Sequence, residues 1–253
     1  MRRFLACALL LILTGSLFAA EKDNTLYELR IYTCPDDAKL DALHARFRDH
    51  TCKLFEKHGM TNIGYWTPID NPEHKLIYII AHKDRDAANA SWKAFMADPD
   101  WQKAYKDSEK DGKLVTKVER TYMQATDYSP AIKPGKNGER VFEFRRYTIT
   151  PGQLEALNDR FRDHTCKLFE KHGMTNVAYF NPVKGEKTAG NTLIYILAHK
   201  SRDAAKASFD AFRKDPDWVA ARKASEEKAG GSLTVKDGVK SLFMKATDYS
   251  PIK

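Results

Sequence analysis

One stretch of seventeen residues, RFRDHTCKLFEKHGMTN, occurs at 46–62 and again, unchanged, at 160–176. A repeat of this length does not arise by chance, so the chain is an internal duplication whose two copies are expected to fold alike. Other stretches also match between the copies: YELRIYT with FEFRRYT, LIYIIAHKDRDAA with LIYILAHKSRDAA, and DPDW and ATDYSP with themselves. The spacing between copies changes only where loops are expected, and loops tolerate insertions. We predict two repeats, at 25–130 and 139–253, joined by a linker at 131–138.

Each copy shows the order strand, helix, strand, strand, helix, strand. TLYELRIYT alternates apolar and polar residues with a period of two, which is typical of a strand. The first helix is predicted to be capped by Asp36 in copy one and by Thr150, followed by a proline, in copy two. It is predicted to end at Gly59 and Gly173, where a left-handed residue can follow a helix.

This order of elements predicts the fold. A βαββαβ unit is the ferredoxin-like arrangement, an antiparallel sheet with two helices on one face. The third strands, LIYIIAH and LIYILAH, are apolar on both faces, which is typical of a strand covered on both sides. The other copy is the available cover for the second face. We therefore predict an α+β fold in which two tandem ferredoxin-like repeats pack sheet to sheet, as a single-chain α/β barrel with its helices outside.

The matched stretches also carry a resemblance. In the order YELRIYT, RFRDHTCKLFEKHGMTNIGYWTP, LIYIIAHKDRDAA, AFMADPDW and ATDYSP, the chain resembles the NIPSNAP family of the dimeric α/β-barrel superfamily. The resemblance covers nearly everything after the first twenty residues, twice. It implies the barrel fold. For function it implies only a superfamily that includes small monooxygenases and haem-handling proteins, and a family whose best-known members are mitochondrial.

The first twenty residues, MRRFLACALLLILTGSLFAA, have the layout of a secretory signal peptide: two arginines, an apolar run and small residues. The apolar run is short for a membrane span. We expect cleavage after residue 20 and an exported protein, periplasmic or secreted, with no stable membrane insertion once processed. A retained anchor is the alternative.

The charge and the motifs of the sequence exclude some classes of binding partner. Loss of the two leader arginines lowers the formal net charge from +8 to +6, and the remaining charges are mixed along the chain. Nucleic-acid binding requires a clustered basic face, so we do not expect it. The sequence contains no CxxC, HExxH or glycine-rich phosphate loop, and we expect neither a metal nor a cofactor. A small molecule and a second copy of the chain remain as partners.

The cysteines after the leader are odd in number, so they do not form a disulfide scaffold. They are Cys34, Cys52 and Cys166. Helical spacing predicts that Cys52 and Cys166 point outward, on helices of opposite halves. A disulfide needs Cα atoms within about 7 Å, so these two are not expected to pair.

The first strands carry the most informative polar residues. If Tyr27, Leu29 and Ile31 face the helices, then the alternate side chains face the barrel interior. Charged groups there must pair with each other or meet a wet cavity. We therefore expect either a Glu–Arg ladder or a pocket for an anionic or carbonyl-bearing small molecule. The candidate ligand-binding residues are Glu28, Arg30, Tyr32, Tyr78, His82, Glu143, Arg145, Tyr147, Tyr195 and His199.

One histidine of the repeated stretch is assigned a structural role in each copy. Leu40, Leu43, Phe47, His50 and Leu54 follow the spacing of a buried helical stripe. His164 occupies the corresponding place in copy two. We predict that both histidines are buried and hold the fold.

The sequence leaves three functions open. The chain could bind a small molecule in the barrel interior, or it could be an interaction module that works through its outer helices. The alternative is a cofactor-poor monooxygenase or isomerase of the α/β-barrel superfamily. A polar cavity with unpaired arginine or tyrosine would favour binding or catalysis, and a packed interior would favour interaction.

Overall fold

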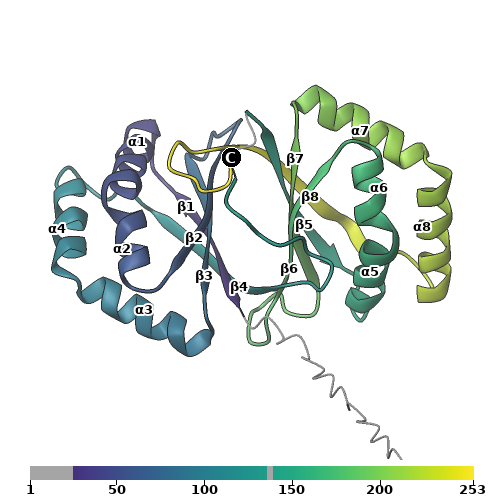
Figure 1. The fold of residues 1–253 in the computed structure, drawn as a ribbon, viewed down its shortest axis with the longest axis horizontal. Coiled ribbons are helices and arrows are strands. Elements are labelled where there is room, and N and C mark those ends of the chain that lie inside the picture. The colour runs from purple at the N-terminus through teal and green to yellow at the C-terminus, as the bar shows by residue number, and fades with distance from the viewer. Residues whose placement is uncertain (1–24, 136–138) are drawn as a thin grey trace, which may run out of the picture.

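The computed structural model describes residues 25–135 and 139–253 (Figure 1). The expected signal peptide at 1–20 and part of the expected linker, residues 136–138, lie outside the described residues. Copy one contains β1 (Leu26–Thr33), α1 (Asp37–Arg46), the π-helical turn η1 (Phe47–Thr51), α2 (Cys52–Lys57), β2 (Thr61–Pro68), β3 (Lys75–His82), α3 (Arg85–Ala97), α4 (Pro99–Ser108) and β4 (Lys117–Ala125). Copy two contains β5 (Val141–Ile149), α5 (Leu154–Arg160), the π-helical turn η2 (Phe161–Thr165), α6 (Cys166–Lys171), β6 (Thr175–Pro182), β7 (Thr192–His199), α7 (Arg202–Lys214), α8 (Pro216–Ala229) and β8 (Thr234–Ala246).

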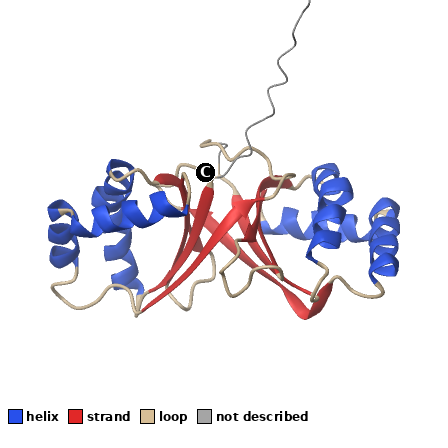
Figure 2. Cartoon of the chain, turned by 90° about the horizontal axis from the view of Figure 1, so that it is seen from below, coloured by secondary structure: helices blue, strands red, loops and turns tan. Residues whose placement is uncertain are grey.

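The strands of both copies form one closed barrel in the order β1-β3-β2-β8-β5-β7-β6-β4. Inside each copy the order is that of a ferredoxin-like sheet, with all pairs antiparallel. The two sheets join where β2 pairs with β8 and β4 pairs with β6. Helices cover the outside of the barrel on two opposite sides (Figure 2). The predicted α+β, single-chain barrel is confirmed.

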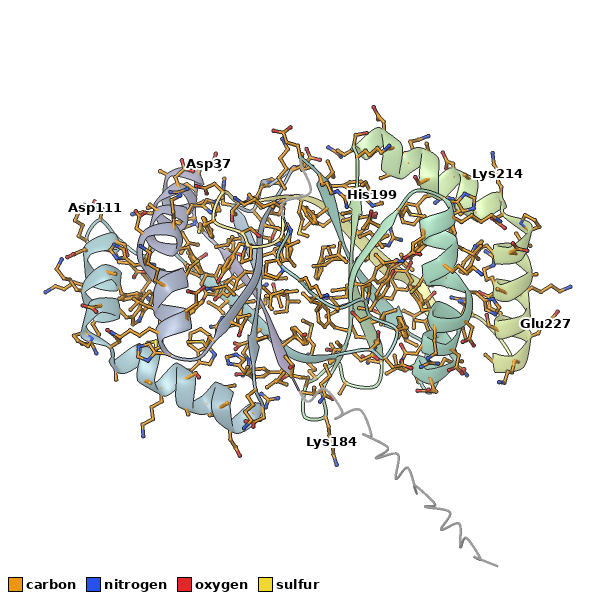
Figure 3. All side chains as sticks on the ribbon, viewed as in Figure 1. Asp37, Asp111, Lys184, His199, Lys214 and Glu227 are labelled. Atoms are coloured by element: carbon orange, nitrogen blue, oxygen red, sulfur yellow. The ribbon has the colours of Figure 1, made fainter. Side chains whose placement is uncertain are left out.

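The barrel interior is filled by apolar side chains from both copies, and Figure 3 shows side chains throughout this space. Trp66, Met123 and Met244 are fully buried there. Ile252, near the C-terminus, and Ile132, from the linker region, pack against the same cluster. The remaining core members are Tyr27, Leu29, Ile31, Ile77, Ile79, Ala81, Phe142, Phe144, Ala178, Phe180, Ile194, Ile196 and Ala198.

The repeated ATDYSP motif crosses from each copy onto the other. Tyr249 of copy two stacks on Phe47 of copy one, with ring centroids 6.2 Å apart, and its hydroxyl lies 2.8 Å from His44 Nδ1. Tyr128 of copy one makes the reciprocal contact with Phe161 of copy two. Bidentate ion pairs accompany both exchanges, Arg48 with Asp248 and Arg162 with Asp127. Each half therefore completes its helix layer with a segment from the other half.

Residues 25–135 produced alone should form a homodimer. An isolated half leaves β2 and β4 without their cross-copy partners and loses the ATDYSP segment of the other half, and a second copy can supply both. Light scattering coupled to size-exclusion chromatography measures the mass. A stable, cooperatively folded monomer of this half would contradict the interdependence of the two copies.

The repeated stretch contains a π-helical turn in each copy, and this turn overturns the prediction for the histidines. A π turn bonds each N–H to a carbonyl five residues back and so inserts one residue into the helix. The insertion rotates the residues that follow by roughly 100°. Thr51 replaces His50 in the buried stripe, and Thr165 replaces His164 in copy two. His50 and His164 are exposed, so their assignment as buried structural residues was wrong.

The same rotation affects the cysteines. Cys52 and Cys166 turn partly inward and pack against the helix-side cores of their copies, which contradicts the outward direction expected of them. Burial raises the pKa of each thiol to about 11. Cys34 is buried at the end of β1. All three are free, so no disulfide links the described residues.

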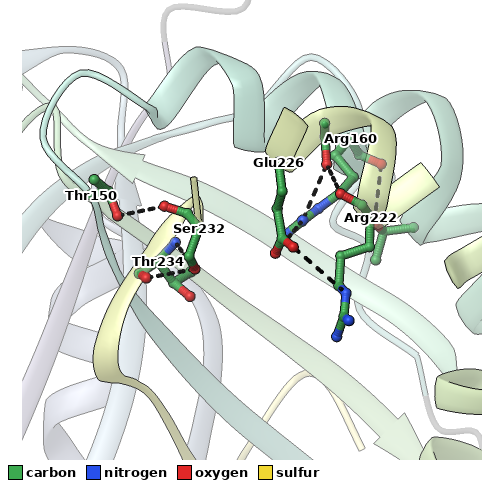
Figure 4. A network of polar contacts seen from close by, with 8 residues as sticks. Thr150, Arg160, Arg222, Glu226, Ser232 and Thr234 are labelled. Atoms are coloured by element: carbon green, nitrogen blue, oxygen red, sulfur yellow. Dashed lines mark hydrogen bonds and ion pairs between the residues drawn. The ribbon is translucent and has the colours of Figure 1, made fainter. Parts of the chain in front are cut away.

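A buried arginine starts the repeated stretch in each copy. Arg46 lies over the Trp101 ring at 5.2 Å, and Arg160 lies over Trp218 at the same distance. Figure 4 shows Arg160 beside Glu226, with Nη1 and Oε1 3.8 Å apart. The figure also shows Thr150, whose hydroxyl donates to the Ser232 carbonyl at 2.8 Å. The predicted Thr150 cap is therefore wrong, because Thr150 is tied to the loop before β8, whereas Asp36 does cap α1.

Thr51→Val should cost about 1–2 kcal/mol of unfolding free energy, because the buried Thr51 hydroxyl donates to the Arg46 carbonyl at 3.1 Å. His50→Ala, one residue away and exposed, should change the free energy by less than about 0.5 kcal/mol. Urea unfolding of both variants makes the comparison. A larger loss for His50→Ala than for Thr51→Val would mean that His50 supports the fold after all.

Candidate functional site

The ten candidate residues gather into two clusters, one in each copy, between the sheet and its helices. β1 and β5 are buried on both faces, so alternation could not decide which face meets the barrel interior. Tyr27, Leu29 and Ile31 fill the barrel interior, and the polar side chains of the same strand turn toward the helices. The predicted lining of the barrel interior was therefore wrong in direction, although the residues do lie together. They are Glu28, Arg30, Tyr32, Tyr78 and His82 in copy one, and Glu143, Arg145, Tyr147, Tyr195 and His199 in copy two.

The Glu28 carboxylate is the centre of the copy-one cluster and is fully buried. His82 Nε2 lies 2.9 Å from Glu28 Oε2, and the Trp92 indole N–H donates to the same oxygen at 2.7 Å. Arg30 Nη1 donates to Oε1 at 2.8 Å. Three elements, β1, β3 and α3, thus converge on one acid.

The cluster keeps Glu28 ionised. Burial by itself would raise the pKa of this carboxyl, but the His82 hydrogen bond, the Arg30 charge and the Trp92 hydrogen bond together lower the Glu28 pKa. For Arg30, burial opposes the charged form, but the charge and hydrogen bond of Glu28 favour it, and the Arg30 pKa is raised. A buried ion pair with its hydrogen bonds in place is costly to break, because one charge is then left alone.

Aromatic rings surround the Arg30 guanidinium. It lies 4.3 Å from the Trp92 ring centroid and 5.5 Å from that of Tyr32. The Arg30 side chain nevertheless keeps 16% of its surface exposed, while Glu28 has none. The arginine is therefore accessible from solvent, together with the half-buried rings of Tyr32 and Trp92.

Copy two repeats this arrangement with one substitution. His199 Nε2 lies 3.1 Å from Glu143 Oε2, and Arg145 pairs with the same carboxylate. The hydrogen bond from His199 and the charge of Arg145 outweigh burial and lower the Glu143 pKa. Phe209 stands where Trp92 stands in copy one, and a phenyl ring donates no hydrogen bond. Trp92 was missed by sequence reasoning, although its exchange for phenylalanine inside a matched helix was a visible signal.

Arg146 of β5 was also missed. The repeat places it where copy one has Ile31, so it lies on the barrel-facing side of its strand. Burial lowers its pKa while Glu119 acts in the opposite direction. Arg146 Nε has no hydrogen-bond partner among the described residues.

The exposed histidines line grooves between the first and last helices of their copies. His50 borders a groove of about 630 Å³ with Asp49, Lys53 and Lys103. His164 borders a corresponding groove of about 750 Å³ in copy two. Charges of both signs line these grooves, and nothing in them selects one ligand chemistry.

Two further findings concern the described residues. They contain no group of three or more His, Cys, Asp or Glu side chains able to hold a metal ion. None of their helices has the length and apolar character that a membrane crossing needs.

Comparison with known proteins identifies the family of this chain and solved structures with a similar fold. The model of the NIPSNAP family matches residues 27–130 and 142–251, once on each copy. No curated protein matches the sequence significantly.

Solved structures resemble the whole barrel. A candidate monooxygenase from Lactobacillus acidophilus is 12% identical, with 90% of this chain and 98% of that chain covered and a TM-score of 0.54. An anthrone oxidase-like protein is 17% identical, with 92% and 95% covered and a TM-score of 0.54. A candidate monooxygenase from Fusobacterium nucleatum is 9% identical, with 89% and 94% covered and a TM-score of 0.55. At these identities the likeness concerns the fold alone.

Glu28→Gln should cost about 3–5 kcal/mol of unfolding free energy at pH 7, because it leaves Arg30 without its partner charge. The folded chain holds the Glu28 pKa below its ordinary 4.5, so in acid the unfolded chain binds more protons. The stabilisation by this carboxylate is therefore complete above that value and is lost as the pH falls through the lowered pKa. Urea unfolding from pH 7 to pH 3 should show the gap between wild type and variant closing below about pH 4.5.

Glu73→Gln is the matched control, because Glu73 pairs with Lys75 near the surface and should contribute less than about 1 kcal/mol. An equal Glu28→Gln penalty at pH 3 and pH 7 would contradict an ionised, paired Glu28.

Proposed function

We propose that this chain, which belongs to the NIPSNAP family as two tandem copies, binds a small molecule at the polar cluster between sheet and helices. The ligand carries a carboxylate or carbonyl oxygen and meets the arginine of the cluster. The proposal places the site outside the barrel interior, because apolar side chains of both copies fill that interior.

The observation that supports this proposal most is the partly exposed arginine held by a buried carboxylate. Arg30 and Arg145 keep 16% and 12% of their side chains exposed, and each is held by a buried carboxylate and aromatic rings. A guanidinium fixed in this way has donors left over and loses little conformational freedom when it binds an oxygen. The apolar packing of barrel and helices does not require an ion pair at this place.

The histidines support the alternative, a cofactor-poor monooxygenase or isomerase acting at the same place. The ionised Glu28 can only accept hydrogen bonds, so the neutral His82 ring donates to it through Nε2. The other ring nitrogen, Nδ1, then carries a free lone pair. His82 Nδ1 and His199 Nδ1 are buried and have no partner among the described residues. Such a nitrogen is a suitable base for taking a proton from a carbon next to a carbonyl held by arginine. The names of the similar solved structures agree with this alternative and do not by themselves establish it.

Residues 1–20 indicate in which cellular compartment the protein would bind its ligand. We propose that the chain works outside the cytoplasm, periplasmic or secreted, because these residues have the layout of an export signal. Cell fractionation of the full-length protein, with N-terminal sequencing of the mature form, tests this.

Native mass spectrometry of the purified full chain should reveal a co-purifying acid or carbonyl compound, and calorimetry with benzoate provides a defined probe. Lysine keeps the charge that Glu28 and Glu143 need but lacks the planar fork of donors. Arg30→Lys combined with Arg145→Lys should therefore weaken benzoate binding by about 10- to 100-fold, the value of one or two hydrogen bonds to a charged group.

Arg222→Lys is the control, because Arg222 pairs with Glu226 on the outer surface of α8. Unchanged benzoate affinity in the double variant, or an equal loss in the control, would contradict a site at these arginines. A proton-transfer role would appear as exchange of substrate hydrogen with solvent deuterium that His82→Gln abolishes.

A further inference from the structure

The two polar clusters differ at one helix position. They also differ in which of their buried polar atoms have a hydrogen-bond partner. Trp92 of α3 corresponds to Phe209 of α7 in the aligned repeats. Trp92 donates to Glu28 and lies 4.3 Å from the Arg30 guanidinium. Phe209 only stacks, with its centroid 4.6 Å from the Arg145 guanidinium.

In copy two the arginine donates to more of its own neighbours. Arg145 Nε donates to the Tyr195 hydroxyl at 2.8 Å, and Arg145 Nη2 donates to the Tyr147 hydroxyl at 3.3 Å. Tyr195 in turn donates to Tyr147 at 2.8 Å. With Nη1 on Glu143, each of its three nitrogens has an acceptor within the chain.

In copy one Arg30 does not make the equivalent bonds to Tyr78 and Tyr32. Arg30 Nε and the Tyr78 hydroxyl are both buried, and neither has a hydrogen-bond partner among the described residues. The two residues lie directly opposite each other on β1 and β3, and Tyr78 has no exposed surface. A buried donor without a partner costs about 1–3 kcal/mol, so two such groups side by side are unstable unless an acceptor joins them.

We propose that the two sites are not equivalent: copy one receives a ligand's carboxylate or carbonyl oxygen between Arg30 Nε and Tyr78 Oη, whereas copy two is closed by its own tyrosines. This inference rests on the proposed function and specifies which half performs it. Both groups facing the oxygen are donors, because burial raises the Tyr78 pKa well above its ordinary value and keeps the hydroxyl protonated.

Trp92 is the residue that sets this difference. Its indole N–H supplies Glu28 with a hydrogen bond that Glu143 lacks, and the Arg30 guanidinium lies over its ring. Phe209 has no such donor, and Arg145 lies over the Phe209 ring while it bonds both tyrosines. Trp92 therefore acts as a positioning residue, and exchange of the two aromatic residues should exchange the behaviour of the two sites.

The test follows the arginine Nε–H signals of the ¹⁵N-labelled full chain by NMR, assigned with Arg30→Lys and Arg145→Lys. Formate is the probe, because it offers a carboxylate with almost no bulk. We expect the Arg30 Nε–H signal to shift saturably with formate, while the Arg145 Nε–H signal stays fixed and exchanges slowly with solvent.

Trp92→Phe should reduce the formate affinity at Arg30 at least about tenfold, as loss of a hydrogen bond to a charged group does. Phe209→Trp should make Arg145 responsive, and both variants change one ring for another and keep the fold. A purely structural role of Trp92 would alter stability without transferring the response between copies.

The outcomes separate this inference from the proposed function. Equal, saturable shifts at both arginines would overturn the inequality of the sites and leave the function standing. No shift at either arginine with formate or benzoate would mean that water alone fills the gap, and both proposals would fail. A response at Arg145 alone would overturn the assignment of the open site to copy one.

Discussion

Each four-stranded sheet of this protein has two apolar faces and only one layer of helices to cover them. Burial of apolar surface stabilises a fold by roughly 25 cal/mol for each Å², so an uncovered sheet face would be strongly unfavourable. The second copy supplies the missing cover, and the barrel closes because β2 pairs with β8 and β4 pairs with β6. The crossed ATDYSP segments then attach each helix layer to the opposite half. The stability of one half thus depends on the other.

This closure also determines where polar chemistry can lie. The barrel interior is lined mainly by apolar side chains, and the ion-paired charged residues of β1 and β5 lie on the helix side. Arg146 of β5 is an exception that faces the barrel. There the helices α3 and α7 supply Trp92 and Phe209, and part of each arginine side chain still meets solvent. A site built between sheet and helices leaves the sheet-to-sheet contact between the two copies undisturbed, because that contact is made through the other face of each sheet.

Much of this arrangement was predictable from the sequence, and the failures have identifiable causes. The duplication, the strand order and the barrel followed from repeated motifs and from the doubly apolar third strands. The ten polar candidates were found because charged residues in a buried strand are rare. Their direction was not found, because a strand covered on both faces shows no difference between its faces. His50 and Cys52 were misplaced because sequence spacing assumes 3.6 residues per turn, and the π turn at Phe47–Thr51 adds one residue.

Fusion of two copies into one chain removes a constraint that a symmetric dimer obeys. In a homodimer every substitution appears in both sites, so a residue that opens one site opens the other. Here the copies keep seventeen identical residues around the π turn, where the fold needs them, and differ at Trp92 and Phe209, beside the polar clusters. They differ again at Ile31 and Arg146, which place an aliphatic side chain and a cation at corresponding positions of the barrel wall. The repeated stretch stays constant while residues beside the two polar clusters differ, and this freedom to differ is what a single-chain barrel gains over two identical subunits.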